Sequence, residues 1–200
     1  MFAPFLGRSI LELGCTAIIA RLDPFRALVM RKYQQQSTYL IEQRNKSAIR
    51  WQGDVFADGV KDLWSENALK NPTRSLLGDY YKTLVWEENY DKLLDAIRNI
   101  NGDQWISELK RKAFSQFYNE TLNELSGVYT GLSKGVHHEF VIPLDSAYDL
   151  ETVKLLIEKT IRNIATLGLF VSVINHTLNK LDIQTAILTY KEIQETEVLK

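Results

Sequence analysis

Two of the chain's three histidines stand side by side, at His137 and His138, within the stretch GVYTGLSKGVHHEF. Imidazole changes charge near neutral pH, so a histidine presented to a ligand can exchange protons with it. The same residues also fit the end of a helix, with Gly131 in the C-cap and a histidine near the last carbonyl groups. The pattern therefore predicts either an acid–base site or a helix end.

A metal site is not indicated by this motif. Adjacent side chains point in different directions, and the spacing of His137, His138 and Glu139 is not that of His-Glu-x-x-His. His176 is almost forty residues further along, on another predicted helix. We therefore expect no metal and no cofactor.

The segment from about Trp105 to Phe170 comprises a long helix ending in YxxLSKGVHHEF, then a loop, then a second long helix. This arrangement resembles the HEPN superfamily of prokaryotic helical-bundle proteins. Many members carry an Arg-x(4–6)-His motif that cleaves RNA without a metal. The resemblance implies that His137 or His138 acts as acid and base, with Lys134 as the nearby cation.

The arginine of that motif is not matched. Thr130, Gly131 and Leu132 occupy the positions five to seven residues before His137. Proteins resembling this family serve in antiphage defence, in toxin–antitoxin pairs, or as subunits beside a nuclease or ATPase. We therefore expect a non-catalytic accessory or regulatory subunit that binds a larger protein. The alternative is a metal-independent ribonuclease, with the cleft formed by a homodimer, in which Lys134 or a remote arginine holds the phosphate beside the histidines.

A second group of polar residues lies in the apolar N-terminal segment. Glu12, Arg21 and Arg26 are candidates for a cluster that supports the histidine loop. The alternative is a set of ion pairs that join the first two helices, because an unpaired buried charge is costly. Arg8 and Glu12 have the i, i+4 spacing of such a pair.

A basic stretch follows and is a candidate surface for nucleic acid or a partner. Its cations alternate with tyrosines and a tryptophan, as in single-strand binding grooves. The same composition is typical of a solvated helix face. The net charge of −1 gives no general attraction to nucleic acid or to membranes. The cations are Arg31, Lys32, Arg44, Lys46 and Arg50.

Apolar side chains recur along the chain with a period of about 3.6 residues, which predicts α-helices. We therefore expect helices to position all of these residues. We predict an all-α, HEPN-like bundle of about six or seven helices in one domain, residues 1–200, with a polar tail at 195–200. A long second helix, 24–51, is expected to project from it. The predicted helices are Pro4–Leu22, Pro24–Trp51, Asp54–Leu69, Thr73–Ile100, Asp103–Leu132, Leu150–Leu181 and Asp182–Glu195.

Composition sets the broader limits. The chain has 200 residues, of which 45% are apolar, enough for a packed core without disulfides. Its lone cysteine, Cys15, lies in an apolar run and is expected to be buried. A single thiol and no recognisable leader or membrane span indicate a cytoplasmic protein.

Overall fold

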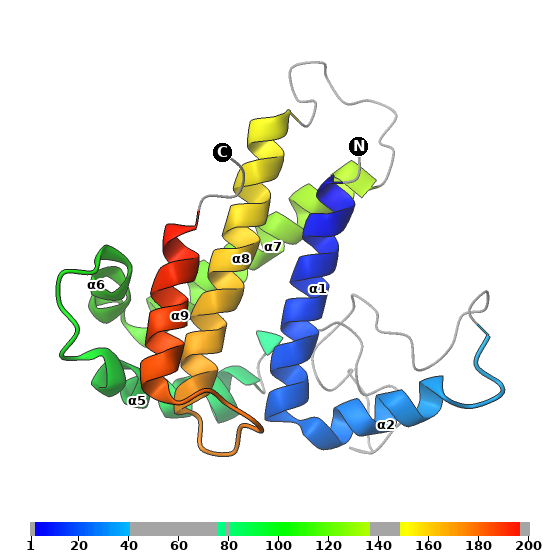
Figure 1. Cartoon of the computed structure of the whole chain (residues 1–200), viewed down its shortest axis with the longest axis horizontal. Helices are drawn as coiled ribbons and strands as arrows, with labels where there is room; N and C mark the ends of the chain where they lie inside the picture. Colours follow the sequence, from blue (N-terminus) through cyan, green and yellow to red (C-terminus); the bar gives the residue numbers. More distant parts are fainter. Residues whose placement is uncertain (1–2, 41–75, 79–80, 137–148, 197–200) are drawn as a thin grey trace.

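The computed structural model describes residues 3–40, 76–78, 81–136 and 149–196. These residues are helical in their regular parts and contain no strand, which confirms the predicted all-α class (Figure 1). The elements are α1 (Ala3–Leu22), α2 (Pro24–Gln34), a π-helix η1 (Lys82–Glu87), α5 (Glu88–Ile97), α6 (Gln104–Arg111), α7 (Phe114–Val136), α8 (Leu150–Val173) and α9 (Ile183–Glu195).

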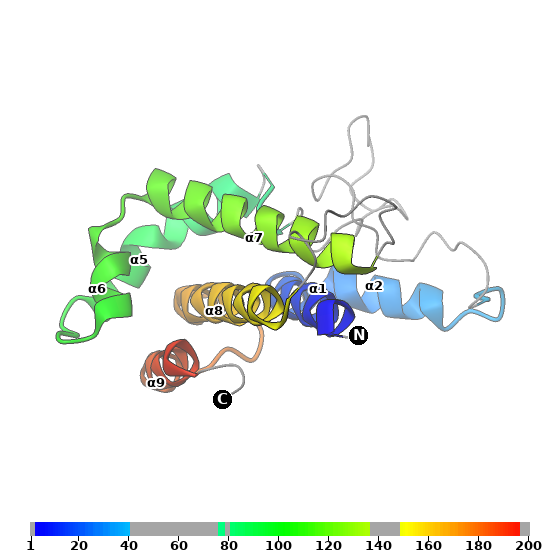
Figure 2. The same cartoon turned by 90° about the horizontal axis from the view of Figure 1, so that it is seen from above.

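Helix α8 is the centre of the bundle. Figure 2 shows it between α7 and α9, with α1 alongside it. Glycines allow the close approach of α1: a Cβ at Gly7 would lie 2.8 Å from Leu132 Cδ2, and one at Gly14 would lie 2.9 Å from Ile164 Cδ1. Since larger residues would push the helices apart, these glycines set the spacing between α1 and its neighbours.

Aromatic rings form the core where η1, α5, α7 and α8 meet. Phe170 of α8 is fully buried, and its ring centroid lies 5.0 Å from that of Trp86, 5.7 Å from Phe117 and 5.9 Å from Tyr90. The Trp86 indole donates a hydrogen bond to the Leu76 carbonyl at 2.6 Å. This cluster joins η1, α5, α7 and α8 into one core, as expected for large apolar surfaces with tilted ring contacts.

The predicted second helix, 24–51, is wrong in extent, because α2 ends at Gln34. Residues 35–38 form turns, with the Tyr39 amide donating to the Gln36 carbonyl at 2.9 Å. The side chains of residues 34–38 are exposed, so continuing the helix would have buried no apolar face. Helical stability in proteins comes mainly from such burial.

The predicted helix Asp103–Leu132 is two helices. Asp103 caps α6 by accepting from the Ile106 amide at 2.9 Å, as expected. Lys112 then adopts an extended conformation, and its carbonyl accepts a hydrogen bond from the Tyr90 hydroxyl at 2.9 Å. The tyrosine thus replaces the helical partner of that carbonyl, and α7 begins at Phe114 in a new direction.

The predicted C-cap at Gly131 is also wrong, because α7 continues to Val136. A Cβ at Gly131 would lie 3.0 Å from Leu156 Cδ2 of α8. This glycine therefore permits close packing of two helices and does not end one.

The predicted helix Leu150–Leu181 stops earlier, at Val173. Asp149 caps its start by accepting from the Thr152 amide at 2.6 Å. Beyond it, Asn179 has a positive φ of 50°, and the Leu178 amide bonds the Arg21 carbonyl at the end of α1 at 2.9 Å. Asp182, accepting from the Thr185 amide at 3.0 Å, then caps α9.

Helix α1 alone among the described helices is long and apolar enough to cross a membrane, by length and composition, with a mean hydropathy of 1.3. Core helices of soluble proteins and signal sequences have the same properties. In this structure α1 packs against α7 and α8, and Cys15 is buried, as predicted.

Candidate functional site

The histidine site stays a prediction, because His137 and His138 lie outside the described residues. Lys134 is exposed on the last turn of α7. Its position leaves the ammonium group accessible to an anion.

The polar residues of α1 do not form one cluster. Arg8 Nε donates to Glu12 Oε1 at 2.9 Å, which confirms the predicted i, i+4 pair, and its guanidinium lies 5.0 Å from the centre of the Tyr129 ring. Arg21 lies nine residues beyond Glu12, about 13 Å along the helix axis, and donates to the Asn179 carbonyl. The side chain of Arg26 lies outside the described part of the structure.

The basic stretch is described only in part. Arg31 and Lys32 are exposed on the last turn of α2. Arg44, Lys46 and Arg50 lie outside the described residues. A continuous basic surface therefore stays a prediction.

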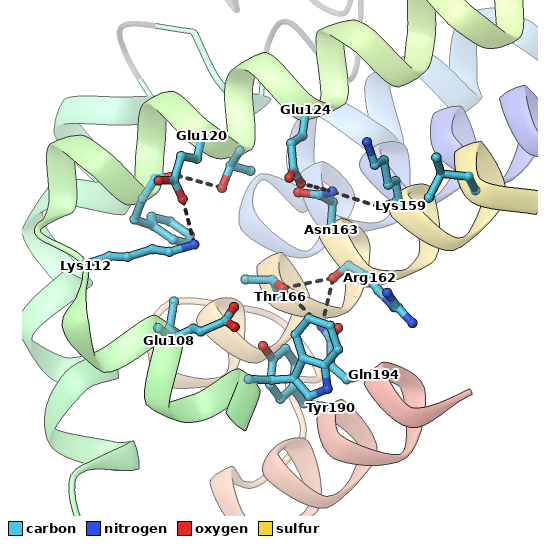
Figure 3. Close-up of a pocket in the computed structure, with 15 residues that line it drawn as sticks. Glu108, Lys112, Glu120, Glu124, Lys159, Arg162, Asn163, Thr166, Tyr190 and Gln194 are labelled. Carbon is cyan, nitrogen blue, oxygen red and sulfur yellow. Dashed lines mark hydrogen bonds and ion pairs between the residues drawn. The ribbon is translucent and has the colours of Figure 1, made fainter. Parts of the chain in front are cut away.

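A polar cleft of about 240 Å³ opens between α6, α7, α8 and α9 (Figure 3). It brings together three carboxylates, three cations, two amides and three aromatic rings among its described lining residues. They include Glu108, Glu120, Glu124, Lys112, Lys159, Arg162, Asn163, Gln194, Trp105 and Tyr190.

Much of the charge in this cleft is paired internally. Lys112 Nζ lies 2.6 Å from Glu120 Oε2, and Asn163 Nδ2 donates to Glu124 Oε2 at 2.8 Å. The hydrogen bonds from Lys112 and Gln116 lower the pKa of Glu120. Burial raises the pKa of Tyr190 to about 12, and the carboxylates of Asp103 and Glu108 add to the effect. Neither Glu120 nor Tyr190 thus changes its charge near neutral pH, and both act as fixed hydrogen-bonding groups.

Arg162 forms the outer wall of the cleft. Its guanidinium lies 4.9 Å from the centre of the Trp105 ring, within the range of a cation–π contact. Arg162 Nη2 lies 4.0 Å from Glu158 Oε2, and Gln194 Nε2 donates to the Arg162 carbonyl at 3.3 Å. The contacts with Trp105 and Gln194 join α6 and α9 to α8, so these residues serve the packing of the helices.

A second cavity has a different character. An apolar groove of about 410 Å³ lies over α8, with α1 and α9 as its walls. Small residues line much of it, so the helix backbones are accessible to a bulky side chain or another helix. The small residues are Gly14, Ala17, Ala165, Gly168 and Ala186, and the larger apolar residues include Ile10, Ile161, Ile164, Leu181 and Ile193.

Exposed apolar residues of α1 extend the groove. Leu6, Ile10, Leu13 and Ala17 recur at intervals of four, three and four, which places them on one face of the helix. Leu13 is 68% exposed and Leu6 is 56% exposed. The apolar surface is therefore wider than the groove itself.

Two cations stand at one end of the groove. Arg21 donates to the Asn179 carbonyl, and Lys180 Nζ donates to the Ile174 carbonyl at 3.0 Å. No carboxylate occurs among the described residues that line the groove, and none in the described ranges lies within 4.0 Å of either cation. The described lining at this end of the groove therefore carries two cations and no carboxylate.

The sequence predicted neither cavity, although α1 carried a signal. Its apolar residues occur on several sides of the helix, a pattern that also fits a central position in the core. The structure buries one side and leaves another open. An apolar residue set wider than one face is the pattern that indicates a second contact surface.

The described residues form an all-α bundle that carries a partly paired polar cleft and an open apolar groove. The comparisons with protein-family models, curated proteins and solved structures found no match.

Proposed function

We propose that this chain is a non-catalytic accessory or regulatory subunit that binds a larger protein partner in the cytoplasm. The observation that carries the proposal is the apolar groove over α8 together with the exposed apolar face of α1. Contiguous apolar surface of this kind is uncommon on monomers and typical of interaction sites.

The energetic argument follows from burial. Each apolar Å² removed from water contributes roughly 25 cal/mol, so covering large side chains such as Leu6, Ile10 and Leu13 favours association. The small residues of the groove also let a partner backbone approach α8 closely. The polar cleft offers less to a partner, since much of its charge is already paired.

The kind of complex is inferred from the resemblance of residues 105–170 to HEPN proteins. We place the chain in an antiphage defence complex, beside an ATPase or a nuclease. In the alternative, the chain is itself a metal-independent ribonuclease that uses His137 or His138, and exposed Lys134 holds the phosphate.

One experiment separates these functions. The tagged chain is co-expressed with the products of the adjacent genes, and RNA cleavage is measured for the wild type and a His137→Ala/His138→Ala variant. Stable recovery of one identified larger protein, without histidine-dependent cleavage, supports the accessory subunit. Cleavage that the double variant loses while it stays folded supports the ribonuclease and refutes our proposal.

A further inference from the structure

We infer that the groove over α8 binds one amphipathic helix of the partner, with an acidic residue at the end of that helix that meets Arg21 and Lys180. This inference rests on the proposed partner-binding function and adds the chemistry of the segment that is bound. It makes α1, α8, α9 and the partner helix a local bundle of packed helices.

The shape of the groove fits a helix. Its floor on α8 extends from Ile161 to Ser172, about 16 Å or three helical turns. Two helices form its walls, and Gly168 lies on the floor with no atom within 4 Å of where a Cβ would be. A helix with apolar residues at i, i+3, i+4 and i+7 places one continuous stripe into such a groove.

The two cations of the groove indicate that the bound helix carries an acidic residue. The apolar part of the groove ends at Arg21 and Lys180, and the described lining residues supply no carboxylate to them. A carboxylate at this end of the bound helix would pair with these cations.

Gly168 provides a direct test. Leucine there has better helix propensity than glycine and projects into the groove. Gly127 on α7 is a matched control, since it too is an exposed glycine within a helix with no atom within 4 Å of a Cβ. Gly168→Leu and Gly127→Leu should both fold, and only the first should block the groove.

The probe is a lactam-bridged helical peptide of about four turns, so that it covers the groove and holds its helix in water. One form has a leucine stripe and two glutamates at one end, and a second form has lysines in place of the glutamates. Fluorescence anisotropy measures the affinity of each form. We expect the glutamate form to bind the wild type and Gly127→Leu equally, and to bind Gly168→Leu at least about tenfold more weakly.

Charge reversal tests the electrostatic part. Lys180→Glu should weaken binding of the glutamate form about two- to fivefold and strengthen binding of the lysine form. Higher salt should reduce the difference between the two peptides. Equal binding of both peptides to the wild type would overturn the acidic feature.

Several outcomes would overturn the helix itself: no binding of either peptide, or equal binding to Gly168→Leu and the wild type. A wild-type homodimer that Gly168→Leu dissociates would also overturn it, since the groove would then hold a second copy of the chain. Binding of the wild type to phosphatidylcholine–phosphatidylglycerol vesicles, lost only in Gly168→Leu, would overturn it as well, since the groove would then hold lipid. If the co-expressed partner stays bound to Gly168→Leu, the inference fails and the proposed function stands. If no partner is recovered, the proposed function itself fails.

Discussion

The close packing of α1 on α8 makes one wall of the groove, and substitution of Gly14 by alanine tests it. The added methyl would lie 2.9 Å from Ile164 Cδ1 and 3.0 Å from Cγ1 and Cγ2. Ile164 is β-branched and partly buried against the core, so it cannot easily turn away. Overpacking of this kind costs about 1–3 kcal/mol.

The alanine also raises helix propensity by about 0.8–1.0 kcal/mol, which offsets part of that cost. Gly127→Ala has the same gain with no steric cost, because nothing lies within 4 Å of its Cβ position. The two variants should therefore differ in free energy of unfolding by about 1–3 kcal/mol, with Gly14→Ala the less stable.

Thermal and urea unfolding, followed by far-UV circular dichroism, measures this difference. For a chain of this size it corresponds to about 2–12 °C in Tm. If Gly14→Ala stabilises the protein as much as Gly127→Ala does, α1 does not pack on α8 as the structure has it. The groove, and the function built on it, would then lose their basis.

Three further predictions concern the core and the helix ends. Tyr90→Phe removes the hydrogen bond to the Lys112 carbonyl between α6 and α7, so it should lower the free energy of unfolding by about 1–2 kcal/mol in urea titrations. An unchanged free energy of unfolding would show that this hydrogen bond does not stabilise the break between the two helices. Phe170→Ala should cost about 3–5 kcal/mol, because it empties the centre of the aromatic cluster; a loss below about 1 kcal/mol would contradict that packing. Asp182 has a pKa lowered from 3.8 by its hydrogen bonds to Thr185, so its carboxylate stabilises the fold at pH values above its unfolded pKa and less as the pH falls through the lower folded pKa. Asp182→Ala should thus have a lower free energy of unfolding than the wild type at neutral pH, and this difference should become smaller in acid. Asp182→Asn keeps a capping side chain that does not titrate. A difference between the wild type and Asp182→Ala that is the same at both pH values would refute the capping role of the carboxylate.

The sequence predicted local features well. Asp103 and Asp182 cap the helices that were expected to begin there, and the Arg8–Glu12 pair forms. Each of these contacts joins residues three or four positions apart, so both partners can be recognised in one short stretch of the sequence. The all-α class follows similarly from the period of the apolar residues.

The errors arose where distant contacts decide the local structure. The break after Arg111 depends on Tyr90, twenty-two residues before Lys112, and Gly131 serves a contact with Leu156 of α8. A glycine near an expected helix end has the same sequence signature whether it caps the helix or allows a neighbour to approach. Only the packing distinguishes the two.

The cavities were hidden from the sequence for the same reason. The groove takes residues from α1, α8 and α9, and its cations come from the end of α1 and from the loop before α9. Arg21 was among the candidate site residues, but as a supporter of the histidine loop. The structure places it instead beside Asn179, at the end of the groove.

The central claim is that the groove over α8 holds the partner protein. Its most direct test is the amount of one identified, co-expressed partner that stays bound to Gly168→Leu compared with Gly127→Leu, with unfolding measured for both. The account predicts that Gly127→Leu retains the partner at the wild-type level and that Gly168→Leu, equally well folded, loses it at least about tenfold. Retention of the partner by both variants would contradict the account.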